Sequence, residues 1–328
     1  MANNRTIPYR RSFSSQAVVL GSQYQMRAPL GRNIRSFFFR ITGTITFAAA
    51  ATTVGRAVGD IVKNIQVKRD GVTIAELPGS SLAFRNWKRP NAASVVNHTG
   101  AIATQSVEME GYLDFANFGG LRPKDSDLST DRTQDLLVYV TMAAGTDIYS
   151  IAPSATALNL EVVAIEHREL ALAQPTRGQS GQEMNEISRP THIRKQRSRT
   201  LAFSAGQTQS ILIDKNKLFE AFTLDVRGAA AAASPANVLS SVRVRLGTDS
   251  IIEMSGDAVR EAHANEMGFA PATGVYIVDF GYNDGGVRSL LAGLDTATFR
   301  EDVYLDLTLS ASTNVLLDEA WFEPSGEM

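Results

Sequence analysis

Short runs of β-branched and aromatic residues, separated by turn residues, recur along the whole chain. Several runs alternate between apolar and polar side chains, as residues 41–47 and 242–246 do, and this is the period of a strand with one buried face. Asp70-Gly71 stands between two such runs and predicts a hairpin turn. The pattern therefore predicts an all-β protein. The runs are residues 18–20, 37–46, 61–67, 136–142, 158–165, 218–226, 238–244, 275–280, 303–309 and 315–322.

Three segments depart from the strand pattern. Residues 80–88 and 256–267 each open with a residue of the type that caps helices, and each continues with good helix formers, so both predict short helices. Residues 171–199 are polar, contain Pro175 and Pro190, and show no hydrophobic period. We expect this third segment to be a linker between two domains.

An internal repeat orders these elements. An ungapped offset of 185 residues aligns the first part of the chain with its second half, and an offset of 177 continues the match past a loop that is shorter in the second copy. The strand, hairpin, helix and Asp-Phe strand then occur twice in the same order, which favours a duplication. The matched positions include Arg10 with Lys195, Gly21 with Gly206, Phe37 with Phe222, Gly43 with Gly228, Ile74 with Ile251, Glu76 with Glu253, Gly79 with Gly256 and Asp114-Phe115 with Asp279-Phe280.

Each half holds about eight candidate strands. A single antiparallel sheet of this size would expose its edges and one apolar face, so each half should close into a two-sheet structure. Loops of very unequal length favour a jelly roll over an up-and-down barrel. We therefore predict two tandem eight-stranded jelly-roll barrels, each with a short flanking helix. The predicted divisions are a basic N-terminal arm over 1–14, a first jelly roll over 15–170, the linker over 171–199, and a second jelly roll with an acidic tail over 200–328.

Composition narrows the possible functions. The 328 residues include no cysteine, which excludes disulfide scaffolds, iron–sulfur clusters and thiol nucleophiles. The formal net charge is only −2, but residues 1–59 hold eight arginines and no acid, whereas residues 295–328 hold eight acids and one arginine. This balance excludes a wholly basic nucleic-acid coat and leaves room for local basic arms.

The chain resembles the double jelly-roll major capsid proteins of tailless icosahedral bacteriophages. The resemblance rests on the tandem barrels, on the strands 37–43 and 222–228 that end in glycine, and on the Asp-Phe strands followed by Gly-Gly loops. Corticoviruses, tectiviruses and finnlakeviruses carry such proteins. The resemblance implies a homotrimer whose six barrels form a pseudo-hexameric capsomer, located in a virion and assembled in the host cytoplasm. It also implies neighbouring capsomers, vertex or penton proteins and minor capsid proteins as partners, and it brings no catalytic residue and no cofactor.

Two other functions compete with this interpretation. A receptor- or carbohydrate-binding spike protein would present clustered aromatic residues, and the chain has only two tryptophans, Trp87 and Trp321. A two-barrel metalloenzyme of the cupin type would need histidines two residues apart, but the four histidines of this chain are isolated from one another. We therefore expect no enzyme and no metal cofactor. Asp125 and Asp127 resemble a fragment of a calcium loop, but the glycine and the distal glutamate of the EF-hand pattern are missing. We therefore favour a solvated loop over a cation that bridges subunits.

Basic residues precede both predicted barrels. Guanidinium groups bind phosphate well, so these residues are candidates for contact with an internal lipid membrane or with the genome. The alternative is that they pair with the acidic tail or with a neighbouring subunit, and the sequence does not separate the two. The candidates are Arg5, Arg10, Arg11, Arg194, Lys195, Arg197 and Arg199.

Overall fold

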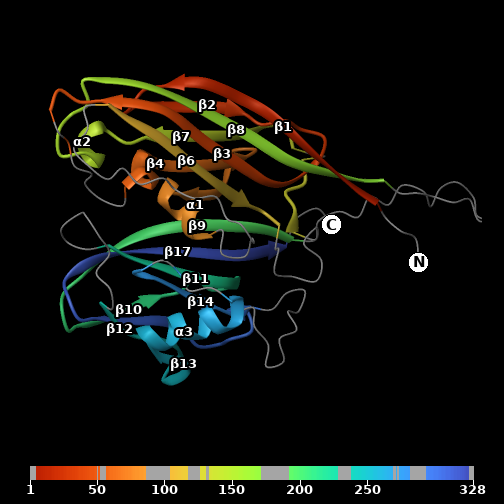
Figure 1. Cartoon of the computed structure of the whole chain (residues 1–328). Helices are drawn as coiled ribbons and strands as arrows, with labels where there is room; N and C mark the ends of the chain where they lie inside the picture. The colour runs from red at the N-terminus through yellow and green to blue at the C-terminus, as the bar shows by residue number, and fades with distance from the viewer. Residues whose placement is uncertain are drawn as a thin grey trace, which may run out of the picture.

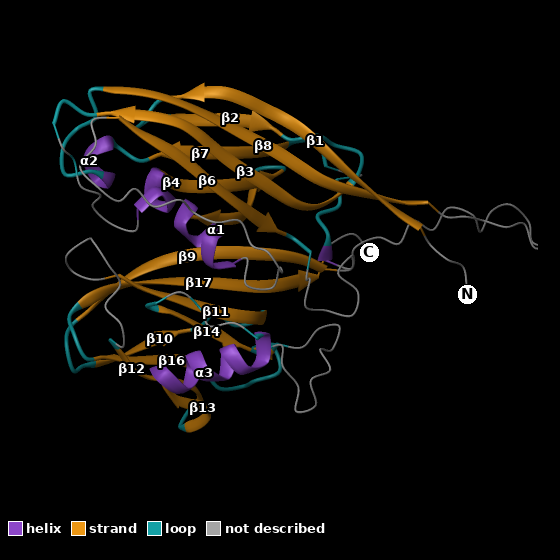
Figure 2. Cartoon of the chain, in the orientation of Figure 1, coloured by secondary structure: helices purple, strands orange, loops and turns teal. Residues whose placement is uncertain are grey.

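The computed structural model is built almost entirely of β-strands, as Figure 2 shows. It describes residues 5–49, 51, 57–85, 104–116, 126–130, 133–170, 192–227, 238–268, 271, 273–280 and 293–324. The strands form two stacked bodies, with the N-terminal half at the top of Figure 1 and the C-terminal half below it. Within the described residues, no helix is long and apolar enough to cross a membrane.

The N-terminal half is an eight-stranded jelly roll. Four strands form a sheet in the order β1-β8-β3-β6, and the other four lie side by side as β5-β4-β7-β2. The strands are β1 (Arg5–Val18), β2 (Gln23–Arg27), β3 (Asn33–Thr46), β4 (Val62–Arg69), β5 (Val72–Leu77), β6 (Thr104–Asp114), β7 (Leu136–Met142) and β8 (Ala155–Leu170).

The C-terminal half repeats this topology. One sheet has the order β14-β11-β17-β9, with the short β15 beside β11, and the facing sheet has the order β10-β16-β12-β13. The predicted double jelly roll is therefore confirmed, with β9 to β14, β16 and β17 standing where β1 to β8 stand in the first barrel. The strands are β9 (His192–Phe203), β10 (Thr208–Leu212), β11 (Leu218–Arg227), β12 (Leu239–Leu246), β13 (Asp249–Ser255), β14 (Val275–Asp279), β15 (Leu294–Asp295), β16 (Val303–Leu309) and β17 (Thr313–Pro324).

The strand ladders of the two halves agree in detail. In the hairpin β4–β5 the register shifts at Ile74, and in β12–β13 it shifts at the matching Ile251. The turns after β1 and β9 both place a glycine at positive φ, Gly21 at 78° and Gly206 at 71°. Such conformations favour glycine because it lacks a Cβ. These shared irregularities support the offsets of 185 and 177 residues.

One part of the sequence alignment is wrong by a residue. Strand β1 bulges at Phe13, because Ser12 pairs with Val163 and Ser14 with Val162, whereas β9 runs beside β17 without a bulge. Before Phe13 the offset between the barrels is therefore 186 and not 185. Arg10 corresponds to Gln196, and not to Lys195 as the ungapped alignment suggested.

Helices flank both barrels. The expected helix over 80–88 is α1 (Gly79–Arg85), and the expected helix over 256–267 is α3 (Gly256–Met267). In α3 the Ser255 side chain accepts a hydrogen bond from the backbone N–H of Ala258, which is an ordinary N-cap. The short α2 (Gly145–Ile148) and the 3-10 turn η1 (Ala57–Ile61) were not expected, because segments of four or five residues carry no helical period.

Two predicted segment boundaries fall inside strands. Residues 5–14, expected as an arm, form most of β1 and pair with β8, and residues 192–199, expected at the end of a linker, form most of β9. Each segment is held in place by backbone pairing to a strand that is far away in sequence. The local sequence pattern does not reveal such pairing. Residues 171–191 lie outside the described part of the chain. Each barrel encloses its own buried apolar cluster, built from both of its sheets.

Candidate functional site at strand β9

Strand β9 joins the two barrels. It pairs antiparallel with β17 along its whole length, and on its other side it pairs in parallel with β5 of the first barrel. The parallel pairs are Ala75 with Gln196 and Glu76 with Arg197. A sheet of the first barrel and a sheet of the second thus become one nine-stranded sheet among the described residues.

One face of β9 fastens the second barrel to the end of β6. Arg194 Nη1 donates a hydrogen bond of 2.8 Å to the backbone carbonyl of Asp114, and Gln196 Nε2 donates one of 2.5 Å to the same carbonyl. Arg194 Nε also donates to Glu220 Oε2 at 2.7 Å. Arg194 is 8% exposed and Glu220 is 1% exposed, so their charges compensate each other inside the protein.

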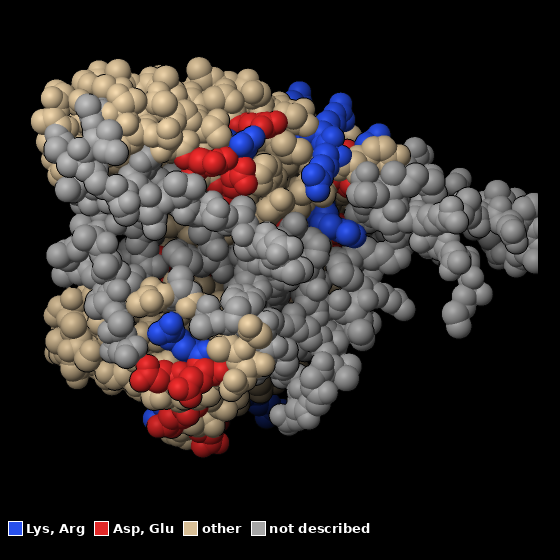
Figure 3. All heavy atoms as spheres, viewed as in Figure 1, with Lys and Arg blue, Asp and Glu red and all other residues tan. Residues whose placement is uncertain are grey.

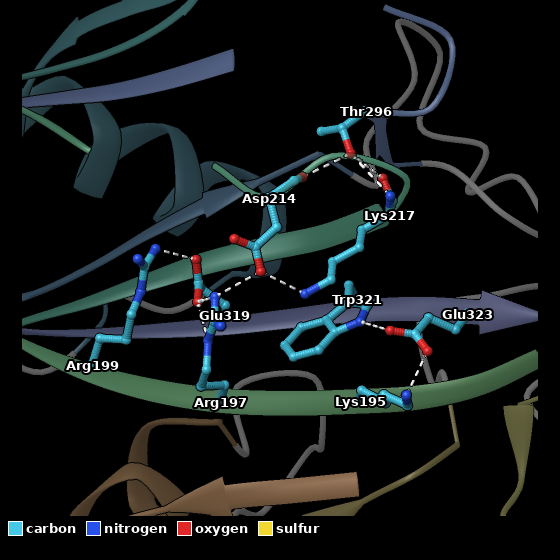
Figure 4. Close-up of polar contacts among 9 residues, drawn as sticks. All are labelled: Lys195, Arg197, Arg199, Asp214, Lys217, Thr296, Glu319, Trp321 and Glu323. Atoms are coloured by element: carbon cyan, nitrogen blue, oxygen red, sulfur yellow. Dashed lines mark hydrogen bonds and ion pairs between the residues drawn. The ribbon is translucent and has the colours of Figure 1, made fainter. Parts of the chain in front are cut away.

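The other face of β9 holds a buried carboxylate, as the close-up in Figure 4 shows. Glu319 of β17 is fully buried and lies between two arginines of β9. Arg197 Nη2 lies 2.6 Å from Glu319 Oε2, and Arg199 Nη2 lies 2.5 Å from Glu319 Oε1. Each oxygen of the carboxylate therefore has its own guanidinium donor, which is the arrangement that a buried charge requires.

The ionic network continues to two residues just before β11, Asp214 and Lys217. Arg197 Nη2 also lies 3.1 Å from Asp214 Oδ2, and Lys217 Nζ lies 2.7 Å from the same oxygen. The hydrogen bond from Lys217 is the main cause that holds the pKa of the Asp214 carboxyl below its usual value; burial opposes it, and the charge of Arg197 adds to it. Lys217 Nζ lies 4.0 Å from the centre of the Trp321 ring, a cation–π distance.

A second acid of the tail closes the network. Glu323 accepts a hydrogen bond of 2.5 Å from Lys195 Nζ at one oxygen and one of 2.8 Å from Trp321 Nε1 at the other. Burial would raise the pKa of Glu323, but these two hydrogen bonds and the charge of Lys195 offset burial and hold this pKa below its usual value.

The four basic residues predicted before the second barrel therefore all form ion pairs within the chain. Lys195, Arg197 and Arg199 pair with Glu323 and Glu319, which belong to the acidic segment 295–328, and Arg194 pairs with Glu220. Three of these four residues thus pair with the acidic tail, which is one of the roles that the sequence left open, and Arg194 pairs outside it.

The basic residues before the first barrel lie differently. Arg10 and Arg11 project from β1 as exposed side chains, and neither forms an ion pair with a residue whose side chain the structure describes. The side chain of Arg5 lies outside the described part. On the face shown in Figure 3, basic side chains gather at the right-hand end of the first barrel. Acidic side chains form two groups, one on the first barrel beside these basic residues and one at the bottom of the second barrel.

Of the two candidate cation ligands, Asp125 and Asp127, the structure describes only Asp127. Asp127 is fully buried, with Oδ1 3.7 Å from Arg35 Nε, and Asp125 lies outside the described residues. Within the described part of the chain, no group of three or more histidine or acidic side chains is arranged to hold a metal ion.

Sequence analysis missed two partners in this site. Glu220 and the carbonyl of Asp114 were not singled out, because Glu220 is flanked on both sides by apolar residues and the Asp114 contact is made by a backbone atom. The register shift between Phe219 and Ala221, where Glu220 is the extra residue, is the local feature that marks it, and such bulges are not visible in a sequence.

No protein-family model matches the chain, and no curated protein matches it in sequence. Solved structures do. One is the major capsid protein of Sulfolobus turreted icosahedral virus (STIV). The alignment covers 97% of this chain and 97% of the STIV protein, with 16% sequence identity and a TM-score of 0.73.

Two further matches are similar. The major capsid protein P2 of bacteriophage PM2 matches 98% of this chain over 100% of its own, with 10% identity and a TM-score of 0.65. The alignment with the Faustovirus major capsid protein covers 98% of this chain and 90% of that protein, with 11% identity and a TM-score of 0.62. At these identities the likeness establishes the fold, and it includes both barrels together. The chain thus has the double jelly-roll fold found in major capsid proteins of these viruses.

Proposed function

We propose that the protein is a major capsid protein, a structural subunit that tiles an icosahedral virion shell. The observation that carries this proposal is the match of the whole double barrel: 97% of the chain and 97% of the STIV protein superpose, so the arrangement of the two barrels is shared as well as the single-barrel topology. A fold by itself does not determine function, but the matched structures named above are all major capsid proteins.

The physical construction suits a shell subunit. The two barrels have separate cores, and β9 couples them through backbone pairing and buried ion pairs. A rigid two-barrel body with strand edges at its far ends is suited to lateral association with identical bodies. In this proposal three copies form a pseudo-hexameric trimer of six barrels.

The proposal places the chain in the virion after assembly in the host cytoplasm. Its partners are its own copies, neighbouring capsomers, and vertex and minor capsid proteins. The exposed Arg10 and Arg11 put positive charge at one end of the first barrel, where a subunit, an internal membrane or the genome would meet it. The role is structural, and no catalytic residue is assigned.

Electron microscopy of the purified chain tests this proposal. The protein, expressed without other viral proteins, is examined in negative stain at increasing concentration. We expect capsomers with a hexagonal outline, and sheets or shells of them at high concentration. Isolated two-barrel particles at every concentration would contradict a shell function.

A further inference from the structure

The edge of β5 is covered by another strand, whereas none of the described strands pairs with the outer edge of its counterpart β13. In the first barrel β5 pairs with β4 on one side and with β9 on the other. In the second barrel β13 pairs with β12 and ends its sheet. An unpaired strand edge offers a row of backbone hydrogen-bonding groups to another strand.

The side chains record the same difference. Ile74 of β5 and Ile251 of β13 occupy the same bulge of the repeated hairpin, yet Ile74 is 3% exposed and Ile251 is 46% exposed. The next residue is Ala75, fully buried, in β5, and Ile252, partly exposed, in β13. At this repeated position the side chain is buried where a second strand covers the edge, and exposed where none of the described residues does.

A matching free edge exists on the first barrel. Strand β1 corresponds to β9, and it ends the sheet β1-β8-β3-β6 with β8 as its neighbour. The strand that covers β5 inside the chain therefore has a counterpart that covers nothing among the described residues. In Figure 1, β1 lies at the top of the molecule and β13 at the bottom, so one chain cannot join the two edges to each other.

We propose that β1 of a second copy of this chain pairs in parallel with β13, and so repeats between subunits the β5–β9 junction found within the subunit. The inference rests on the proposed function, since it names the contact that builds the trimer. The register follows from the repeat. The pairs Ala75 with Gln196 and Glu76 with Arg197 become Ile252 with Arg10 of the second copy and Glu253 with Arg11 of the second copy.

Charge supports this register. The Glu253 side chain is 64% exposed, and its nearest described basic partner, Arg243 of the same hairpin, lies 3.6 Å away. Arg11 is exposed and has no ion pair with a described side chain. The proposed register sets these opposite charges side by side, and cross-strand neighbours of opposite charge stabilise a sheet.

The contact is head-to-tail, so it can close into a ring. Different surfaces meet at each junction, and such heterologous contacts form a closed ring when the rotation between copies is right. A ring of three copies would then contain three β5–β9 junctions and three β13–β1 junctions. All six barrels would be joined in the same way.

Cysteine cross-linking tests the register, and the cysteine-free chain makes the test clean. The variant Arg10→Cys/Ile252→Cys, assembled and then oxidised, should give covalent dimers and trimers on a denaturing gel, because paired strands bring Cα atoms within disulfide range. The pair Ala75→Cys/Gln196→Cys should close within one chain and give only monomer. The control Arg10→Cys/Leu212→Cys uses β10, the opposite edge of the sheet that contains β13. Equal cross-linking in this control and in the test variant would overturn the proposed junction.

Charge reversal provides a second test. Arg11→Glu and Glu253→Arg should each raise the dissociation constant of the trimer at least about tenfold, and their combination should restore most of the loss. Ile251→Asp should weaken the trimer as well, whereas Leu212→Asp, at a residue 54% exposed on β10, should not. A trimer that tolerates all of these changes overturns the β13–β1 contact and leaves the capsid proposal standing. A wild-type chain that never associates overturns both.

Discussion

Arg197 of β9 and Glu319 of β17 form an ion pair of 2.6 Å, and Arg199 binds the other oxygen of the same buried carboxylate at 2.5 Å. Replacing Glu319 with glutamine keeps the shape and removes the charge. We expect Glu319→Gln to lower the free energy of unfolding by about 1–3 kcal/mol, because the hydrogen bonds to the arginines lose their charge assistance. Chemical unfolding followed by circular dichroism measures this change in the free energy of unfolding.

The matched control is a surface pair of the first barrel. Glu108 pairs with Arg40 at 2.9 Å, and both side chains are more than 40% exposed. Glu108→Gln should cost less than about 1 kcal/mol, as exposed pairs do. If the two variants lose the same free energy of unfolding, the burial of Glu319 does not strengthen its ion pairs, and the prediction is contradicted.

The junction between the barrels depends on Arg194. Arg194→Met removes the partner of the buried Glu220 and one of the two donors to the Asp114 carbonyl. We expect a loss of about 3–5 kcal/mol, because the buried carboxylate of Glu220 loses its guanidinium partner. Adding Glu220→Leu should recover much of this loss, since an apolar pair of similar volume tolerates burial.

Calorimetry reads out the coupling as well as the stability. The wild-type chain should unfold its barrels in one transition, and Arg194→Met should separate the transitions of the two barrels. A single transition with an unchanged midpoint in the variant would contradict a role for Arg194 in joining them.

Acid should weaken the second barrel through Asp214. Its pKa is lowered in the folded state, chiefly by the hydrogen bond from Lys217, so the ionised form favours folding. The stability it contributes is present above its ordinary value of 3.8 and is lost as the pH falls through the lowered folded-state pKa. In thermal melts, Asp214→Asn should therefore flatten the fall in stability below about pH 4. An unchanged acid profile in Asp214→Asn would refute this assignment.

Gly43 is a position where only glycine fits. Its φ is 150°, and an added Cβ would lie 2.0 Å from the carbonyl oxygen of Ala157 in the paired strand β8. Gly43→Ala should cost more than about 2 kcal/mol in unfolding measurements, since the backbone of β8 must move. Gly31→Ala adds a Cβ in open space at a φ of 87°, so it should cost about 1 kcal/mol from backbone strain alone.

The architecture was predictable from the sequence because both barrels carry the same local signals in the same order. Alternating runs, the Asp70-Gly71 turn and the capped segment beginning at Gly256 are each set by neighbouring residues. The one-residue error before Phe13 arose because a bulge is defined by the partner strand β8, which lies more than a hundred residues away.

The site was harder to predict for the same physical reason. The run from Arg194 to Arg199 is too polar for a strand by local criteria. The charges of Lys195, Arg197 and Arg199 are compensated by acids of β17 that lie 120 to 128 residues further along the chain. Sequence analysis identified both the basic run and the acidic tail. Only the β9–β17 register shows which residues meet, and only the β5–β9 pairs show that this strand joins the barrels.

The mass of the purified chain in solution tests the central claim most directly. Light scattering coupled to size-exclusion chromatography, at concentrations up to those used for assembly, should give a species of three times the 35.4 kDa of one chain. A mass that remains at 35.4 kDa throughout would contradict a trimeric shell subunit.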